Sequence, residues 1–326
     1  MLHQEYQHIN QILPSGRTDS NLFQKVKHLD ELSGKGLKYI QSAKSLIVQK
    51  KEDGVHCAIV VQPYYDTFRI GLFSRTGKAF TCVQHLVVFL KEQARKGYLR
   101  SGVYFGELVN PELTLEELSG FVNPNRTNAP EPALASCARD FQIHLFDHVT
   151  LTEYLDGSTA RPYWERLQGC EVIPYTELWL LVRQVSTVVL RDLEEADLVF
   201  NELISEGHEG VVIRNEGAPW QAGHKGQYSV KRVRAVSYDL LCIGAESGKG
   251  KREGLVAKLL FRWRDGKTLK ADLGKGWTDD KRPCIENAGT LVGGVYRVYG
   301  LQDSSKGLIR LAKVGERRID KTEPDY

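Results

Sequence analysis

Apolar residues recur along the chain at two spacings, which predict helices and strands respectively. In the segment 84–95, Phe89 and Leu90 follow Leu86 by three and four residues, so we expect a helix that buries these side chains. The stretch Phe141–Phe146 is typical of a strand. Both periods occur in the first two thirds of the chain, which indicates a mixed α and β domain there.

Three further segments have less regular patterns. Residues 176–206 predict two helical segments on either side of Asp192, ending near Gly207. The first 40 residues mix polar and apolar positions, and we expect helices that lead into the first strand. The segment 123–132 contains three prolines and three asparagines, which favours a surface loop.

From Val236 onwards the pattern changes to short strands separated by polar turns. Five such strands within about 90 residues fit a small Greek-key barrel such as an OB-fold, or a small sandwich. The segment Gly244–Gly250 resembles a phosphate loop, but its glycines are four residues apart and no Ser or Thr follows Lys249, so we expect a basic hairpin loop. The five strands are predicted at 238–243, 255–263, 268–273, 295–298 and 308–312.

The length of the chain and the distribution of its charges indicate two domains. A chain of 326 residues suggests two domains, which we place at 1–235 and 236–326. The second contains 18 Lys and Arg against 13 Asp and Glu, net +5, and the first contains 26 against 28, net −2. A basic C-terminal domain suits a polyanionic partner.

The sequence also argues against a membrane-spanning, a secreted and a zinc-binding protein. No apolar run approaches the roughly 20 residues that span a bilayer, and the N-terminus lacks the features of a signal peptide, so we expect a cytoplasmic protein without a membrane partner. The six cysteines are scattered without zinc-site spacing, and we interpret them as reduced thiols. Nothing indicates an oligomer, and a monomer is expected.

The strongest candidate chemistry lies at the end of the apolar run 45–48. Lys51 follows this run, with Asp53 and Gly54 after it, so a lysine stands at a strand end beside a carboxylate and a glycine that allows close backbone approach. In an extended strand Gln49 and Lys51 share one face and Lys50 points to the other. A nucleophilic lysine also needs neighbours that favour its uncharged form.

Further motifs follow this lysine in a fixed order. They are Ser74–Gly77, Tyr104–Leu108, Phe146–Asp147, Glu209–Ile213, Lys231 and Arg318–Lys321. Together with the lysine motif they resemble the covalent nucleotidyltransferases, and most closely the small ATP-dependent DNA ligases of the bacteriophage type. The resemblance runs from about Gln41 to the last residue.

The resemblance implies an α+β fold: a nucleotidyltransferase (adenylation) domain of antiparallel sheets with flanking helices, followed by an OB-fold barrel. It implies an enzyme that seals nicks in double-stranded DNA, with ATP and Mg²⁺ as cofactors. The lysine attacks the α-phosphate of ATP, AMP passes to a 5′-phosphate, and the 3′-hydroxyl then displaces AMP. In the family the barrel closes over the ATP phosphates and later clamps DNA, which places a hinge near 233–237.

The resemblance also assigns roles. Lys51 is the nucleophile, and the catalytic cations are Lys231 and, from the barrel, Arg318 and Lys321. Carboxylates must hold Mg²⁺, for which Glu107 and Glu209 are the candidates; the family gives Glu107 the ribose hydroxyl and Glu209 the metal.

The remaining assigned residues surround the base and the phosphates. Phe146 stacks on adenine, Gln49 meets the adenine edge and Arg75 binds phosphate, whereas Asp147 has no assigned role. Two positions depart from the family pattern. His56 stands where arginine is usual, and Ser229 replaces the first of two lysines of which Lys231 is the second.

Two alternatives stay open. A GTP-dependent mRNA capping guanylyltransferase also has both domains, although the tail of this chain looks more like that of a ligase. A catalytically inactive nucleic-acid-binding relative is supported by His56 and Ser229. NAD-dependent ligases are disfavoured because no four-cysteine zinc module is found, and RNA ligases because they generally lack the motif at 318–321.

Overall fold

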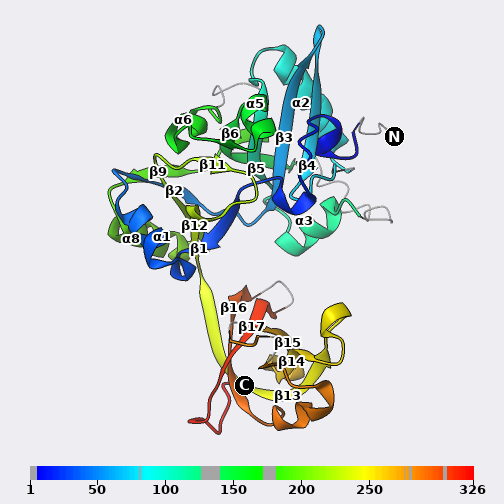
Figure 1. The fold of residues 1–326 in the computed structure, drawn as a ribbon, viewed down its shortest axis with the longest axis vertical. Coiled ribbons are helices and arrows are strands. Elements are labelled where there is room, and N and C mark those ends of the chain that lie inside the picture. Colours follow the sequence, from blue (N-terminus) through cyan, green and yellow to red (C-terminus); the bar gives the residue numbers. More distant parts are fainter. Residues whose placement is uncertain are drawn as a thin grey trace. The chain divides into compact units, whose positions relative to one another are not determined.

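A computed structural model describes residues 6–80, 82–125, 140–171, 181–274, 276–278, 281–303 and 307–326. The chain divides into two compact units, Met1–Arg232 and Val233–Tyr326 (Figure 1). Among the described residues, no helix is both long enough and apolar enough to cross a membrane.

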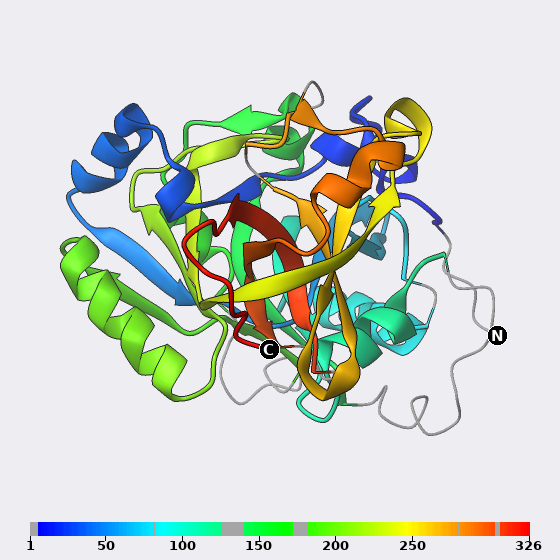
Figure 2. The same cartoon turned by 90° about the horizontal axis from the view of Figure 1, so that it is seen from below.

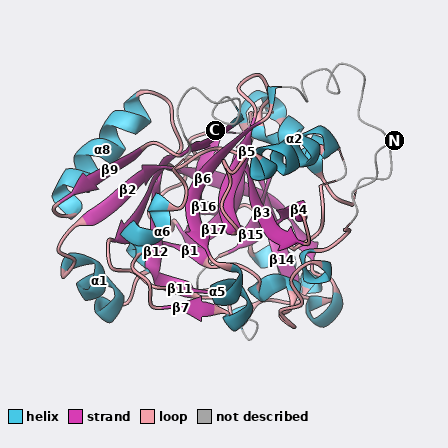
Figure 3. Cartoon of the chain, turned by 90° about the horizontal axis from the view of Figure 1, so that it is seen from above, coloured by secondary structure: helices cyan, strands magenta, loops and turns pink. Residues whose placement is uncertain are grey.

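The first unit contains two five-stranded sheets. One sheet has helices α1 and α8 on one face (Figures 1 and 3), where Ile40 of α1 and Ala196 of α8 pack against Val48, Val211 and Ile213 of the strands. In spatial order its strands are β1 (Lys25–His28), β12 (Lys225–Val233), β10 (Gly210–Asn215), β2 (Leu46–Lys50) and β9 (Thr187–Leu190), and the helices are α1 (Gly34–Gln41) and α8 (Leu193–Ser205).

The second sheet packs one face against helices α2 and α3, so that its core includes Ile59 and Leu72 from strands and Leu86 and Leu90 from α2. Its other face packs against the N-terminal segment, with Ile9, Ile12 and Phe73 in the core. Its strands, in spatial order, are β4 (Thr67–Ser74), β3 (Val55–Tyr64), β5 (Gly102–Val109), β6 (Gln142–Val149) and β8 (Val182–Gln184), and the helices are α2 (Gln84–Arg95) and α3 (Leu115–Val122).

Short elements complete this unit. A two-stranded sheet links residues that lie on either side of β9, α8 and β10 in sequence. These elements are β7 (Ser158–Thr159), β11 (Trp220–Gln221), α5 (Leu151–Asp156), α6 (Tyr163–Gln168) and the 3-10 helices Ile9–Gln11, Asp19–Asn21 and Leu29–Glu31.

The register of the strands determines which side chains meet. Across β3, β5 and β6, His56 lies opposite Glu107, and Glu107 lies opposite His144. Directly opposed residues in an antiparallel pair point to the same face, so these three side chains form a row. In the first sheet, β2 and β10 are antiparallel with Lys50 opposite Val211, which brings the residues after β2 next to those before β10.

The second unit is a closed five-stranded barrel around one apolar core, with Leu259, Phe261 and Val298 among its fully buried residues. Its strands, yellow to red in Figure 2, cross one another as a strongly twisted closed sheet requires. The predicted barrel is therefore confirmed. In barrel order the strands are β13 (Ala235–Ser247), β14 (Val256–Arg262), β15 (Thr268–Leu273), β17 (Ile309–Arg317) and β16 (Val295–Asp303), with 3-10 helices at Gly250–Arg252, Arg264–Gly266 and Ile285–Thr290.

Several local predictions can be compared with these elements. The helix expected at 84–95 is confirmed as α2, and the helix after Asp192 is confirmed as α8. The helix expected before Asp192 is wrong from residue 182 onwards, where β8 and β9 stand; this stretch is rich in β-branched residues, which favour strands. Residues 172–180 lie outside the described part of the chain.

Two other expectations need correction. Of the helices expected in the first 40 residues, α1 is confirmed as the one that leads into β2. Before residue 34 the described segment contains only 3-10 helices and β1, because its apolar residues pack on the second sheet and its backbone pairs with β12. The strand β13 continues to Ser247, so the predicted hairpin loop is shorter than expected and turns after that residue.

Candidate active site

A cleft of about 250 Å³ opens between the two sheets of the first unit. Strands β2, β10 and β12 line it from one sheet, and β3, β5 and β6 line it from the other. A concave site with apolar walls and a few convergent polar groups is typical of small-molecule binding. The candidate residues on its wall are Gln49, Lys51, Arg75, Glu107, Phe146 and Lys231.

Lys51 is the first residue after β2. Its backbone N–H donates to the carbonyl of Gly210 at 2.9 Å, and its Nζ donates to Oε2 of Glu209 at 2.6 Å. Both contacts follow from the antiparallel register of β2 and β10. Lys50 instead places its Nζ 3.3 Å from Oε1 of Glu52. The structure thus separates the two adjacent lysines, and only Lys51 reaches a candidate metal carboxylate.

Gly54 is required by packing. A Cβ at this position would lie 2.7 Å from the carbonyl oxygen of Leu108 and 2.8 Å from the side chain of Val109. Any larger residue would therefore push β5 away. Because β5 carries Glu107, this glycine keeps that carboxylate close to the segment of Lys51.

Glu107 is a partly buried carboxylate that lines the cleft. Burial raises its pKa to about 7; Lys51 and Arg75 counteract this rise, and Glu209 adds to it. The neighbours that act on Glu107 are thus the other candidate residues, which places them in one electrostatic environment.

Glu107 and Glu209 also fit a metal ion of one particular kind. Both offer carboxylate oxygens, the ligands of hard cations such as Mg²⁺. Within the described residues no group of three or more His, Cys, Asp or Glu side chains forms a complete metal cage. Two carboxylates that leave positions for phosphate oxygens and water are the usual protein contribution to a Mg²⁺ site.

Basic residues line the same cleft. Lys231 lies on β12, where burial lowers its pKa and Lys51 lowers it further, with Glu209 opposing. Arg75 follows β4 and also lines the cleft. Ser229, two residues before Lys231, is buried, and its hydroxyl has no hydrogen-bond partner among the described residues.

His56 does not replace the charge of the arginine expected at its position. Burial, with a contribution from Arg75, lowers its pKa to about 3, so the imidazole is neutral at pH 7. Its ring lies 5.2 Å from that of Phe23 and 6.0 Å from that of Phe146. His56 therefore extends an aromatic wall of the cleft.

On the cleft wall, Phe146 stands beside a hydrogen-bonded group that the sequence motifs did not indicate. The amide oxygen of Gln49 accepts from Nη1 of Arg214 at 2.6 Å, and the hydroxyl oxygen of Tyr163 lies 2.9 Å from it. That hydroxyl donates its one hydrogen to the carbonyl of Phe146 at 2.5 Å and accepts from Nη1 of Arg214 at 3.1 Å. No local pattern could have found these contacts, because the partners of Gln49 lie more than 100 residues away.

Asp147, which had no assigned role, forms a buried ion pair with Arg166. Nε and Nη2 of Arg166 lie 2.9 and 3.2 Å from the two carboxylate oxygens, and its Nη1 donates to the carbonyls of Arg161 and Ala218. The three partners of Arg166 lie in three different segments of the chain. The pair therefore fixes β6, and with it Phe146, to α6 and to the loop before β11.

Arg318 and Lys321 belong to the barrel unit and not to the unit that contains the cleft. Both contact Oδ2 of the buried Asp239, at 2.7 and 2.6 Å. Arg318 also forms a two-pronged pair with Asp320, at 2.8 and 2.6 Å. Burial opposes ionisation of Asp239, but hydrogen bonds from Lys321 and Arg318 outweigh it and lower the pKa of this carboxyl.

Comparison with known proteins agrees with this geometry. Residues 34–232, which contain Lys51, Glu107, Glu209 and Lys231, match the family model described as ATP dependent DNA ligase domain. The chain belongs to the ATP-dependent DNA ligase family. The resemblance seen in the motifs is therefore confirmed.

Relatives of this ligase-family chain carry the corresponding names. A probable DNA ligase of Rhodococcus opacus is 32% identical over 223 residues, covering 59% of this chain and 41% of the relative. DNA ligase 2 of Methanosarcina mazei is 26% identical over 258 residues, covering 74% and 43%. The chain thus spans less than half the length of either relative.

Solved structures share the fold. A structure from a study of Lig E DNA ligases aligns with a TM-score of 0.64 at 16% identity, covering 91% of this chain and 98% of the other. The ATP-dependent DNA ligase of bacteriophage T7, solved with ATP, aligns with a TM-score of 0.54 at 18% identity, covering 92% and 99%. The predicted α+β class, an adenylation domain followed by a barrel, is confirmed.

Proposed function

We propose that this chain is an ATP-dependent DNA ligase that seals nicks in duplex DNA through a covalent lysine–AMP intermediate. The observation that carries the proposal is the cleft in which Lys51 contacts Glu209 and faces Glu107. Membership of the ligase family and the names of its relatives support it. The proposed partner is nicked double-stranded DNA, on which the chain acts as a monomer.

In the first step, Nζ of Lys51 attacks the α-phosphorus of ATP. A P–N bond forms, the bond to the bridging oxygen breaks, and pyrophosphate leaves. The ammonium of Lys51 must first lose a proton, and Oε2 of Glu209, 2.6 Å away, is the acceptor of its hydrogen bond.

Negative charge on the phosphoryl group needs cations in the transition state. Lys231 and Arg75 line the cleft and supply two of them. Mg²⁺ bound by Glu107 and Glu209 would supply further positive charge at the phosphates. Phe146 packs on the adenine, and Glu107 also contacts the ribose.

The same residues serve the later steps. AMP passes from Lys51 to the oxygen of a DNA 5′-phosphate, which breaks the P–N bond; the 3′-hydroxyl then attacks that phosphate and AMP leaves. Arg75 and the net charge of +5 on residues 236–326 suit contacts to DNA phosphates. Binding carried by such contacts weakens steeply as salt rises.

One experiment separates this function from its rivals. Purified protein is incubated with Mg²⁺ and α-labelled ATP or GTP, and acid-labile label on the chain is measured. Label from ATP alone supports the ligase, label from GTP supports a capping enzyme, and no label supports an inactive nucleic-acid-binding protein. Lys51→Ala should abolish labelling, and the matched change Lys50→Ala should retain most of it. Full labelling of Lys51→Ala would show that another residue is the nucleophile.

A further inference from the structure

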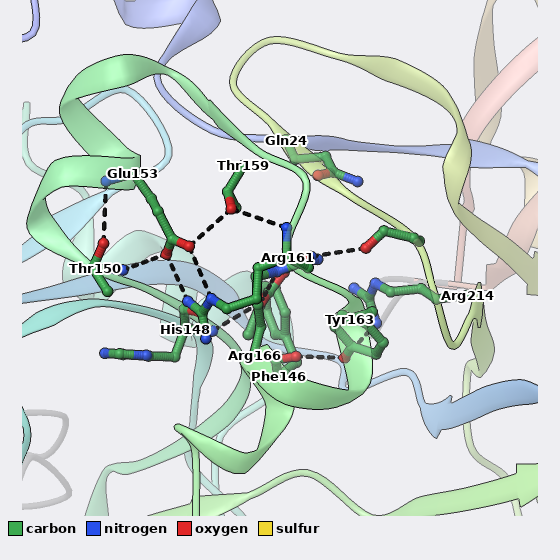
Figure 4. Close-up of polar contacts among 12 residues, drawn as sticks. Gln24, Phe146, His148, Thr150, Glu153, Thr159, Arg161, Tyr163, Arg166 and Arg214 are labelled. Atoms are coloured by element: carbon green, nitrogen blue, oxygen red, sulfur yellow. Dashed lines mark hydrogen bonds and ion pairs between the residues drawn. The ribbon is translucent and has the colours of Figure 1, made fainter.

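Arg214 on β10 is a buried cation that lines the cleft, with a relative exposure of 5%. Its guanidinium lies over the rings of Tyr163, at 4.7 Å, and Phe146, at 5.4 Å (Figure 4). Among the residues that the structure describes, no carboxylate forms an ion pair with it. A charge buried without a counter-charge is costly, so the contacts it does make are informative.

Those contacts fix the side-chain amide of Gln49 in one orientation. Nη1 of Arg214 lies 2.6 Å from one terminal atom of this amide, and because a guanidinium can only donate, that atom must be the oxygen. At the other end, the hydroxyl of Thr187 donates to the carbonyl of Val185 at 2.8 Å. Its oxygen therefore accepts from the remaining terminal atom of Gln49 at 3.2 Å, which must be Nε2.

This orientation determines what Gln49 offers to a ligand. Its oxygen already accepts from Arg214, and Arg214 in turn donates to the hydroxyl of Tyr163. Its Nε2 has two hydrogens, and within the described residues only Thr187 takes one of them. Gln49 lines the cleft beside Phe146. The amide therefore presents a hydrogen-bond donor to the cleft.

We propose that Arg214 and Tyr163 are positioning residues that hold Gln49 as a donor to ring nitrogen N1 of the base, and so select adenine. N1 of adenine is an unprotonated acceptor, whereas guanine and hypoxanthine carry a hydrogen there and would set two donors against each other. A site built around a buried donor discriminates strongly against a ligand that leaves the donor unpaired. This inference rests on the proposed lysine adenylation.

The first test uses the unmodified protein. Covalent adducts with ATP, with ITP, which carries hypoxanthine, and with 1-deaza-ATP, which has a C–H in place of N1, are followed by intact-mass spectrometry in the presence of Mg²⁺. We expect both analogues to react at least about tenfold more slowly than ATP. Reaction of 1-deaza-ATP at the rate of ATP would overturn the inference and leave the ligase function standing. No adduct with any nucleotide would overturn the proposed function and the inference with it.

The second test uses the arginine itself. Arg214→Met removes the donor and allows the Gln49 amide to flip, so the ratio of the ATP rate to the ITP rate should fall at least about fivefold. Tyr163→Phe should also lower the ratio of the ATP rate to the ITP rate, but by a smaller factor than Arg214→Met. The control is Arg191→Met, which removes an exposed arginine paired with Glu195. Partial unfolding lowers both rates equally, so an unchanged ratio in Arg214→Met would contradict the proposal.

Discussion

At the scale of single residues, burial accounts for most of the unusual chemistry of the cleft. Glu107, His56 and Lys231 each have a pKa shifted towards the uncharged form, with desolvation as the largest cause. Such shifts are common where a protein prepares a site for a charged ligand. The raised pKa of Glu107 means that Lys51 and Arg75 do not fully offset its desolvation, so a cation bound beside it would favour its charged form.

Glu107 makes stability depend on pH. Its pKa rises from 4.5 to about 7 on folding, so the folded protein binds this proton more tightly than the unfolded chain. The contribution to stability is complete below pH 4.5 and is lost as pH rises through about 7, amounting to about 3 kcal/mol. Glu107→Gln cannot ionise, and we expect its melting temperature, relative to that of the wild type, to increase between pH 5 and pH 8 without nucleotide or Mg²⁺.

Thermal unfolding at several pH values measures this difference. The control is Glu171→Gln, which changes an exposed glutamate of the same unit. A difference between Glu107→Gln and the wild type that stays constant from pH 5 to pH 8 would contradict the raised pKa.

The residues of the cleft also show what sequence can and cannot reveal. Lys51, Glu107 and Phe146 stand in short motifs whose order was sufficient to place them in one candidate site. Arg214 and Tyr163 act through side-chain contacts to a glutamine or to each other, far away in sequence. Arg214 directly follows the motif Glu209–Ile213, but that motif does not indicate a contact with Gln49. Long-range pairing of buried polar groups depends on tertiary structure, so these two could be found only in the fold.

At the scale of elements, prediction succeeded where one spacing of apolar residues extended over the whole element. α2 has apolar residues at helical spacing throughout, and its predicted bounds match the structure. β8 and β9 have three and four residues, too few for a period to be recognised, and the packing of their sheets determines their conformation. The N-terminal segment is similar, because β1 forms only by parallel pairing with β12, about 200 residues later.

Helix α8 offers a test of how an element supports the site, because it covers the sheet that carries Lys51 and Glu209. Asp192 caps it by accepting from the backbone N–H groups of Glu194 and Glu195 at 2.9 and 3.0 Å. We expect Asp192→Ala to lower the free energy of unfolding by about 1 kcal/mol, measured by urea denaturation. Labelling of Lys51 per folded molecule should not change.

The matched change in the same helix is Glu202→Ala, which removes an exposed carboxylate and leaves the cap intact. Its effect on stability should stay within about 0.5 kcal/mol. Equal losses in the two variants would mean that the cap of α8 contributes nothing beyond an ordinary surface position.

At the scale of the whole molecule, the two units have separate cores. The apolar residues of the barrel form one cluster, and those of Met1–Arg232 form the others. Only Arg234 stands between the last strand of the first unit, β12, and the first strand of the barrel, β13. Such an arrangement suits a pivot, and we propose that the hinge expected near 233–237 is centred there.

The proposed mechanism assigns the two units different steps. Arg318 should contact the ATP phosphates only while Lys51 is being adenylated, so Arg318→Ala should slow labelling of Lys51 by at least about tenfold. Sealing of a nick that already carries AMP should stay within about threefold of the wild-type rate, because that substrate bypasses the first step. The matched control is Arg297→Ala, since Arg297 contacts the same Asp239 at 3.1 Å without belonging to the motif. If Arg297→Ala slowed labelling equally, the effect of Arg318 would come from the ion pairs of the barrel and not from the phosphates of ATP.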